Sequence, residues 1–300
     1  MSVPALDVRD LRKDFGALSA LRGVTFSVAP GEVFGYLGPN GAGKTTTLRI
    51  VLGLVRQSGG SARLFGIDSG LPASRADVGF LPGDLRLYGD LTAAATLDFF
   101  ARFRPARPPA LRPMLVDALG LDAATLARRV KFLSHGTRQK VGLVAAMQHD
   151  PALVLLDEPT NGLDPLVQHA FRAVVGEFAR RGRAVLFSSH VLSEVEAMCQ
   201  RVAILRRGEI VALETIGRLR EKVVRKLTVR FRGEAPPGLG GTAGVTRSQV
   251  RGREAVLWIQ GDPNPVVRAL AAADVDDLAF PEPELEDIFL AYYGEERRDA

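Results

Sequence analysis

The chain has 300 residues, 46% of them hydrophobic and 24% charged, which suits one main globular domain with a smaller companion and excludes a disordered or fibrous chain. Its formal net charge of +5 is compatible with an anionic ligand, a nucleic acid or an anionic membrane surface, and does not choose between them. Cys199 is the only cysteine, which excludes an intramolecular disulfide and fits a reducing compartment.

The N-terminal sequence "MSVPALDVRD" has no basic segment followed by an apolar one, so we expect no signal peptide. No apolar run approaches the ~18 residues that a membrane span requires. If the protein works at a membrane, we expect another chain to supply the membrane-spanning segments.

The first part of the chain predicts strands followed by a glycine turn and then helices. Strands are predicted at residues 3–9, 20–28, 32–37 and 62–65. The third strand leads into "GPNGAGKTTTLRIVLGLV", a glycine-rich turn followed by a helix. Residues 92–149 are predicted to be mostly helical, with breaks at Pro105, Pro108 and Pro109.

From residue 153 strands and helices alternate, which predicts an α/β fold with a parallel sheet and crossover helices. The strands are "LVLLD", "AVLFSS" and "RVAILRRG", and the helices are residues 165–181 and "LSEVEAMC". After about residue 220, "RKLTVRF" and "AVLWIQ" predict strands of a separate small unit, and "NPVVRALAAAD" and "PELEDIFLAYYG" predict helices. Alternation in "AVLWIQ" predicts that Trp258 points into the core of this unit.

Residues 38–45, "GPNGAGKT", fit the pattern of a phosphate-binding loop between a strand and a helix. The glycines allow successive backbone N–H groups to point at a phosphate, and the helix adds the positive end of its dipole. Lys44 is predicted to neutralise the β- and γ-phosphates, and the Thr45 hydroxyl to bind Mg²⁺. The predicted nucleotide-binding residues here are Gly38, Asn40, Gly41, Ala42, Gly43, Lys44, Thr45 and Thr46.

Two carboxylates follow the apolar strand "LVLL", at the sheet edge where ligands of α/β proteins bind. Asp157 is predicted to hold Mg²⁺, and Glu158 to orient or deprotonate the attacking water. His190 follows the strand "AVLFSS" at the same edge, where a hydrogen-bond donor could reach a γ-phosphate. Lys44, Glu158 and His190 are therefore the predicted catalytic residues.

In this order, the segments resemble the motifs of the nucleotide-binding subunit of an ABC transporter over residues 3–215. "GPNGAGKTT" resembles its Walker A motif, "LVLLDEP" its Walker B motif with the catalytic glutamate, and "SSH" its switch histidine. "LSHGT" resembles its signature motif and "NGLD" its D-loop. The resemblance implies a P-loop NTPase fold at residues 1–220. That fold is a RecA-like parallel sheet core with an antiparallel β subdomain and a helical subdomain inserted at about 84–150. Residues 221–300 would form a small C-terminal α+β accessory domain.

The resemblance also implies that two subunits, identical or closely similar, meet head to tail. Ser134 and Gly136 of one subunit would then bind the ATP held by the P-loop of the other, with Asp164 in the D-loop beside it. Phe15 falls where the family places an aromatic residue that stacks on adenine.

One position departs from the family pattern. In "VGFLPGDLRLYGDLT" the family has a glutamine, or sometimes a glutamate, after "LP", where this chain has Gly83 followed by Asp84. We expect the loop to couple mechanically, without a side chain on the metal.

The function that the resemblance implies is ATP hydrolysis, with ATP and Mg²⁺, that powers a separate permease at the cytoplasmic face of the membrane. "LEDIFLAYY" resembles the ABC-2 branch, which exports drugs, lipids or polysaccharides. The main alternative is a soluble ABC ATPase that acts on nucleic acid or the ribosome. This alternative is supported by the basic stretch "RLREKVVRKLTVRFR". A regulator without turnover is disfavoured by the presence of Glu158, and no nucleic-acid partner is expected.

Overall fold

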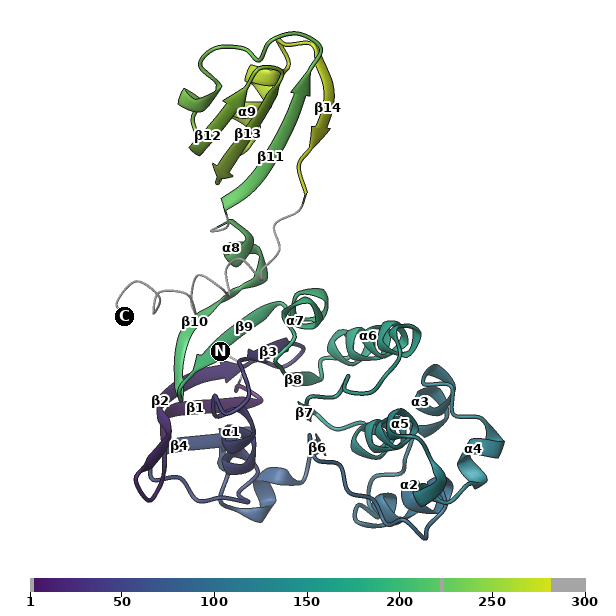
Figure 1. The fold of residues 1–300 in the computed structure, drawn as a ribbon. Coiled ribbons are helices and arrows are strands. Elements are labelled where there is room, and N and C mark those ends of the chain that lie inside the picture. Colours follow the sequence, from purple (N-terminus) through teal and green to yellow (C-terminus); the bar gives the residue numbers. More distant parts are fainter. Residues whose placement is uncertain (1–2, 222–223, 282–300) are drawn as a thin grey trace. The chain divides into compact units, whose positions relative to one another are not determined.

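The computed structural model describes residues 3–221 and 224–281, and the chain divides into two compact units at Leu213/Glu214 (Figure 1). Among these residues, no helix combines the length and the apolar character needed to cross a bilayer.

An antiparallel sheet in the first unit has the strand order β2-β1-β4-β5. Its strands are β1 (Leu6–Phe15), β2 (Leu18–Val28), β4 (Gly59–Leu64) and β5 (Ile67–Asp68). Leu6, Val8 and Leu11 of β1 are completely buried, while the residues between them are partly or fully exposed. Leu6 and Val8 alternate as a strand with one buried face requires, and the register shift between Val8 and Leu11 allows Leu11 to be buried as well.

The central sheet has six strands in the order β10-β9-β3-β8-β7-β6. Their bounds are β3 (Val33–Leu37), β6 (Val78–Leu81), β7 (Leu153–Asp157), β8 (Ala184–Ser189), β9 (Arg201–Arg206) and β10 (Glu209–Thr215). The pairs β9–β3, β3–β8, β8–β7 and β7–β6 are parallel, so those strands end at one common edge. All residues of β3, β7 and β8 are buried, which explains their continuous apolar sequences.

Helices cover this sheet and carry a separate helical region. Helix α1 (Lys44–Val51) contacts β4 and β7, and α6 (Pro165–Arg180) and α7 (Leu192–Met198) contact β8. The helical region contains α2 (Ala93–Arg102), α3 (Arg112–Ala118), α4 (Ala123–Ala127) and α5 (His135–Met147), and short 3₁₀ turns lie at Pro72–Arg75 and Val130–Phe132. Helix α5 packs against α2 and α3, so it links the helical region to the sequence that precedes β7.

The second unit is a four-stranded sheet in the order β12-β13-β11-β14. It consists of α8 (Ile216–Glu221), β11 (Val224–Phe231), a 3₁₀ turn at Leu239–Gly241, β12 (Val245–Arg251), β13 (Glu254–Gln260), α9 (Asn264–Leu270) and β14 (Val275–Ala279). Its core is apolar and includes Leu227, Val229, Leu257, Ile259 and Val266. The sequence "PELEDIFLAYYG", predicted to be helical, lies outside the described residues.

The prediction for Trp258 was wrong. Leu257 and Ile259 of β13 are buried in the core, so the side chain between them faces the opposite side of the sheet. On that side Trp258 is partly exposed and lies between Lys226 on β11 and Arg247 on β12. The guanidinium carbon of Arg247 lies 4.7 Å from the centroid of the Trp258 ring.

A buried histidine makes the stability of the first unit depend on pH. His149 is 5% exposed, and its Nε2 has no hydrogen-bond partner among the described residues. Burial, with a smaller contribution from the Arg104 charge, lowers the pKa of His149 from 6.5 to about 4. The unfolded chain therefore takes up this proton first, and stability is lost as the pH falls from about 6.5 towards 4.

We therefore expect His149→Gln to reduce the loss of unfolding free energy between pH 7 and pH 5 by on the order of 1–2 kcal/mol. Urea titrations of both proteins at both pH values measure this difference. The exposed His169 supplies the control, since His169→Gln should leave the pH dependence unchanged. Equal losses in wild type and His149→Gln would contradict the assignment.

Candidate active site

The predicted phosphate-binding loop connects the buried end of β3 to the start of α1. Gly41 and Gly43 have φ values of 80° and 111°, which residues with a side chain rarely adopt. A Cβ atom on Gly43 would lie 2.7 Å from Leu21 Cδ2, and one on Gly38 would lie 2.5 Å from the Leu205 carbonyl oxygen. Conformation and space therefore both require glycine here.

Lys44 begins α1 and is only 6% exposed. Its ammonium group donates to the carbonyl oxygens of Gly38 at 2.6 Å and Pro39 at 3.3 Å. Glu158 Oε1 lies 3.2 Å from Lys44 Nζ as an ion pair, but without the geometry of a hydrogen bond. The cation is thus held at the mouth of the glycine loop, where a phosphate oxygen could replace the Glu158 carboxylate.

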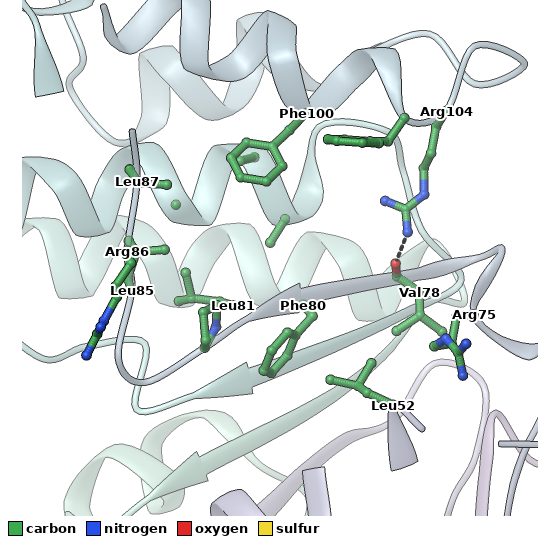
Figure 2. A pocket seen from close by; sticks show the side chains of 15 residues that line it. Leu52, Arg75, Val78, Phe80, Leu81, Leu85, Arg86, Leu87, Phe100 and Arg104 are labelled. Carbon is green, nitrogen blue, oxygen red and sulfur yellow. Dashed lines mark hydrogen bonds between the residues drawn. The ribbon is translucent and has the colours of Figure 1, made fainter. Parts of the chain in front are cut away.

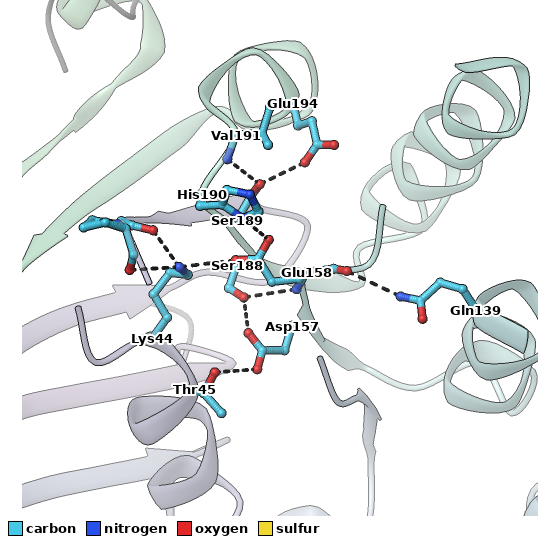
Figure 3. Close-up of polar contacts among 12 residues, drawn as sticks. Lys44, Thr45, Gln139, Asp157, Glu158, Ser188, Ser189, His190, Val191 and Glu194 are labelled. Atoms are coloured by element: carbon cyan, nitrogen blue, oxygen red, sulfur yellow. Dashed lines mark hydrogen bonds and ion pairs between the residues drawn. The ribbon is translucent and has the colours of Figure 1, made fainter. Parts of the chain in front are cut away.

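The two residues predicted to bind Mg²⁺ contact one another. The Thr45 hydroxyl donates to Asp157 Oδ2 at 2.8 Å, and Ser188 Oγ at the end of β8 donates to Asp157 Oδ1 (Figure 3). Asp157 is buried and Thr45 is exposed. The parallel pairing of β7 with β8 places Asp157 opposite Ser188, which sets this contact.

Glu158 lies between two of the other predicted catalytic residues. Its Oε2 is 2.7 Å from His190 Nδ1, while its Oε1 faces Lys44 (Figure 3). The backbone of Glu158 has φ of 50°, and its N–H donates to the Ser188 carbonyl oxygen at 3.1 Å. The geometry holds one carboxylate at the strand edge, in reach of both a cation and an imidazole.

The signature and D-loop segments lie against one another in the same chain. Ser134 caps α5, since its Oγ accepts from the Thr137 N–H at 3.1 Å, and the side chain is exposed. A Cβ on Gly136 would lie 2.3 Å from the Gly162 carbonyl oxygen, so this helix start needs glycine for close packing. Asp164 caps α6 by accepting from the Val167 N–H at 3.0 Å.

Gln139 is a site residue that the sequence pattern did not indicate. It is 2% exposed on α5, and its amide donates to the carbonyl oxygens of Pro159 at 3.1 Å and Glu158 at 3.4 Å. The signature helix is thereby tied to the backbone that carries Glu158. The sequence feature that could have indicated Gln139 is a polar residue on an otherwise apolar helix face, since a buried polar side chain needs hydrogen-bond partners.

Phe15 lies at the end of β1, half exposed, with Lys13 Nζ 4.6 Å from its ring centroid. It is therefore outside the core, where a planar base could stack on it. Asn40, Gly41 and Thr45 are also exposed, while Gly38 and Ala42 are buried and Gly43 and Thr46 are partly buried.

In the loop after β6, Gly83 lies beside the predicted metal ligand, whereas the Asp84 side chain points to solvent. A Cβ on Gly83 would lie 3.3 Å from Asp157 Oδ2, so the Gly83 backbone runs directly beside the predicted metal ligand. The Asp84 side chain is 72% exposed and pairs with Arg86 at 2.8 Å. Asp84 is thus engaged with solvent and Arg86, which favours a loop that contributes backbone and no side chain to the metal.

Asp84→Ala should therefore change kcat only a few-fold and leave the Mg²⁺ dependence of ATP hydrolysis in place, because an exposed ion pair contributes little. Steady-state ATPase assays across a Mg²⁺ titration test this, with Arg86→Ala as the control that breaks the same pair. A large fall in apparent Mg²⁺ affinity in Asp84→Ala alone would identify Asp84 as a ligand.

The residues present fit a nucleoside triphosphate with Mg²⁺. The glycine loop leaves no room for a side chain at Gly38 and Gly43, Lys44 faces an exchangeable carboxylate, and Glu158 Oε1 is buried without a hydrogen-bond partner. Among the described residues no group of three or more histidines, cysteines or acids lies together as a metal site. One hydroxyl and one carboxylate suit Mg²⁺, which keeps waters and takes phosphate oxygens as further ligands.

Comparisons with known proteins agree with these motifs. Residues 21–161 match the family model described as ABC transporter. The chain is 38% identical to an uncharacterised ABC transporter ATP-binding protein, YdbJ of Bacillus subtilis (strain 168), over 75% of this chain and 74% of that protein. It is 33% identical to the Nod factor export ATP-binding protein I of Paraburkholderia xenovorans (strain LB400) over the full length of both.

Solved structures show the same fold. A structure described as the ATP-binding subunit of an ABC transporter has a TM-score of 0.67 and 32% identity, and covers 72% of this chain and 92% of its own. The dimeric structure of MJ0796, a bacterial ABC transporter cassette, has a TM-score of 0.63 at 21% identity, covering 70% of this chain and 98% of its own.

Proposed function

This chain belongs to the ABC transporter ATP-binding proteins, and from that membership we propose that it powers a separate ABC-2-type permease that exports a lipid-, drug- or polysaccharide-like substrate. Members of the family are ATPases, so the reaction is hydrolysis of ATP to ADP and phosphate. The single observation that carries the catalytic part of the proposal is the placement of Glu158 between Lys44 and His190.

Each residue at the strand edge has a proposed role in that reaction. Glu158 accepts a proton from the attacking water, and His190 donates a hydrogen bond to the γ-phosphate after leaving Glu158. Lys44 exchanges the Glu158 carboxylate for β- and γ-phosphate oxygens. These exchanges release Glu158 from both of its present partners when the nucleotide binds.

Thr45 and Asp157 would hold Mg²⁺, which neutralises the phosphate charge that develops during transfer. Ser188 fixes the orientation of the Asp157 carboxylate through its hydroxyl. The glycine loop offers backbone N–H groups to the phosphates and keeps side chains out. Phe15 stacks on the base.

A groove beside β6 is proposed to receive the permease. Its volume is about 430 Å³, and its walls come from β6, α2, α5 and the loop after Gly83 (Figure 2). Phe80 and Leu81 lie on one side and Phe100 on the other (Figure 2), and the lining also includes Phe103, Arg75, Arg86 and Arg104. An apolar groove with arginines in its lining suits a short amphipathic segment of a membrane protein near an anionic surface.

The exporter assignment rests on the relative that aligns over its full length, whose name describes export of Nod factor. That name belongs to the relative, and the substrate class of this chain is proposed by similarity alone. The proposed place of action is the cytoplasmic face of the membrane, reached through the permease. Two copies would form the composite ATP sites, and the cassette of similar fold described above is dimeric.

The part of the basic stretch that the structure describes as β11 alternates exposed cationic and buried apolar residues. In β11, Lys226 and Arg230 are exposed, while Leu227, Val229 and Phe231 are buried. Arg230 also pairs with Asp276 at 3.0 Å. This alternation is that of an ordinary strand with one solvated face, so it does not support the alternative.

Affinity purification of the tagged chain from its native membranes tests the proposal. A polytopic membrane protein should co-purify, and Phe103→Asp in the groove should lose it while retaining MgATP binding. Val250→Asp, an exposed apolar residue on β12, is the matched control and should keep the partner. Recovery of RNA or ribosomes in place of a membrane protein would overturn the proposed function.

A further inference from the structure

The second unit contains a cavity of about 270 Å³ whose ten lining residues are all apolar. Leu227 and Val266 form its floor and are buried. At its rim Val267 of α9 is 53% exposed and Leu278 of β14 is 48% exposed. Val229 pairs with Leu278 across β11 and β14, so Leu278 lies on the core face and remains uncovered there. An apolar hollow with an apolar rim favours an apolar occupant.

The described chain ends at the rim of this cavity. Phe280 lines the cavity, and Arg225 stacks on its ring with 3.7 Å between the guanidinium carbon and the ring centroid. The same guanidinium donates to the carbonyl oxygens of Pro281 at 3.1 Å and Phe280 at 3.4 Å. These contacts fix the point from which residues 282–300 continue.

The sequence of those residues has the chemistry to fill the cavity. Leu285, Ile288, Phe289 and Tyr292 recur with the spacing of one helical face, and Pro283 stands where helices often begin. Leu285 is four residues beyond Pro281, a reach of up to ~14 Å. Glu286 and Asp287 supply acidic groups for the other face, and Arg268 follows Val267 as an exposed cation on α9.

We propose that residues 285–292 of this chain bind in the apolar cavity of their own C-terminal unit, with Ile288 and Phe289 against Val267 and Leu278. Three observations carry the proposal: the apolar cavity, the anchored exit of the chain at its rim, and the apolar stripe that begins within reach of it. The segment then completes the core of the unit. The inference does not depend on the proposed export function.

Disulfide trapping in the full-length chain tests the contact. Val267→Cys combined with Phe289→Cys should form a disulfide within one chain under mild oxidation, detected by peptide mass analysis and by migration as a monomer. Val250→Cys combined with Phe289→Cys is the matched control and should form none, because Val250 is exposed on β12 and does not line the cavity. Burial raises the pKa of the Cys199 thiol, which keeps this thiol protonated during the reaction.

Hydrogen exchange gives a second readout that does not require cysteines. Val267→Asp should make the amides of residues 285–292 exchange about tenfold faster or more, while Val250→Asp leaves them unchanged. A disulfide between two chains would overturn the proposal in favour of a second copy as the occupant. Failure of both the disulfide and the exchange response, with ATP binding retained, would show that the segment does not bind there.

Discussion

Glu158→Gln should bind MgATP and hydrolyse it at least ~100-fold more slowly than the wild-type chain, the range expected when a general base is removed. Glutamine has nearly the same shape, so it can still lie beside Lys44 and His190, but it cannot accept a proton from water. Because hydrolysis is the step that reopens the proposed dimer, the variant should also accumulate as an ATP-bound dimer.

Single-turnover hydrolysis and sedimentation in the presence of MgATP measure the two effects. Glu194→Gln is the matched control, since Glu194 accepts a hydrogen bond from Ser189 Oγ at 2.8 Å, whereas within the described residues Lys44 and His190 pair with Glu158. It should retain turnover within a few-fold. Turnover close to the wild-type rate in Glu158→Gln would remove Glu158 from its proposed role.

A mixed dimer of one Lys44→Ala subunit and one Ser134→Ala subunit should retain one functional ATP site. If Ser134 acts on the nucleotide of the partner, the unmodified P-loop faces the unmodified signature segment at one site, and both substitutions meet at the other. If Ser134 acted within its own chain, each site would carry one defect. The exposed position of Ser134 at the start of α5 leaves its hydroxyl accessible to a second molecule.

The reciprocal arrangement is the control. One subunit with both substitutions, paired with an unmodified subunit, should lose both sites under action between subunits, and keep one under action within a chain. ATP trapping per dimer in differentially tagged mixtures counts the sites. If the first mixed dimer traps no ATP and the second traps ATP at one site, Ser134 acts within its own chain and the composite site is ruled out.

The sequence predicted the parts of the site that depend on local pattern. The glycine loop at residues 38–43 and the carboxylates after β7 could be placed because strand, turn and helix follow directly in the chain. The role of Gln139 could not be predicted in this way, because its hydrogen-bond partners are backbone carbonyl groups in a segment twenty residues away. The capping contacts of Ser134 and Asp164 were also not anticipated, although both residue types favour that position.

The errors in the predicted strands have separate causes. Strand β13 alternates Leu257 and Ile259 with Val256 and Trp258, so both faces carry apolar residues and alternation alone cannot say which is buried. Strands β12 and β14 were missed because "VTRSQVR" and "VDDLA" are rich in polar residues. In the first unit, strand β6, "VGFL", was not predicted because it is only four residues long and is followed by Pro82.

If Glu158 has the proposed role of general base, its positive φ sets a limit on how stable this protein can be while it remains active. A residue with a branched or long side chain in the left-handed region loses roughly 1–2 kcal/mol relative to an ordinary conformation, and glycine or asparagine loses less. Substitution by either residue would relax the backbone and remove the carboxylate. Under the proposed role of Glu158, a substitution that raises heat resistance at this position should therefore lower turnover, so the strain is a condition of activity.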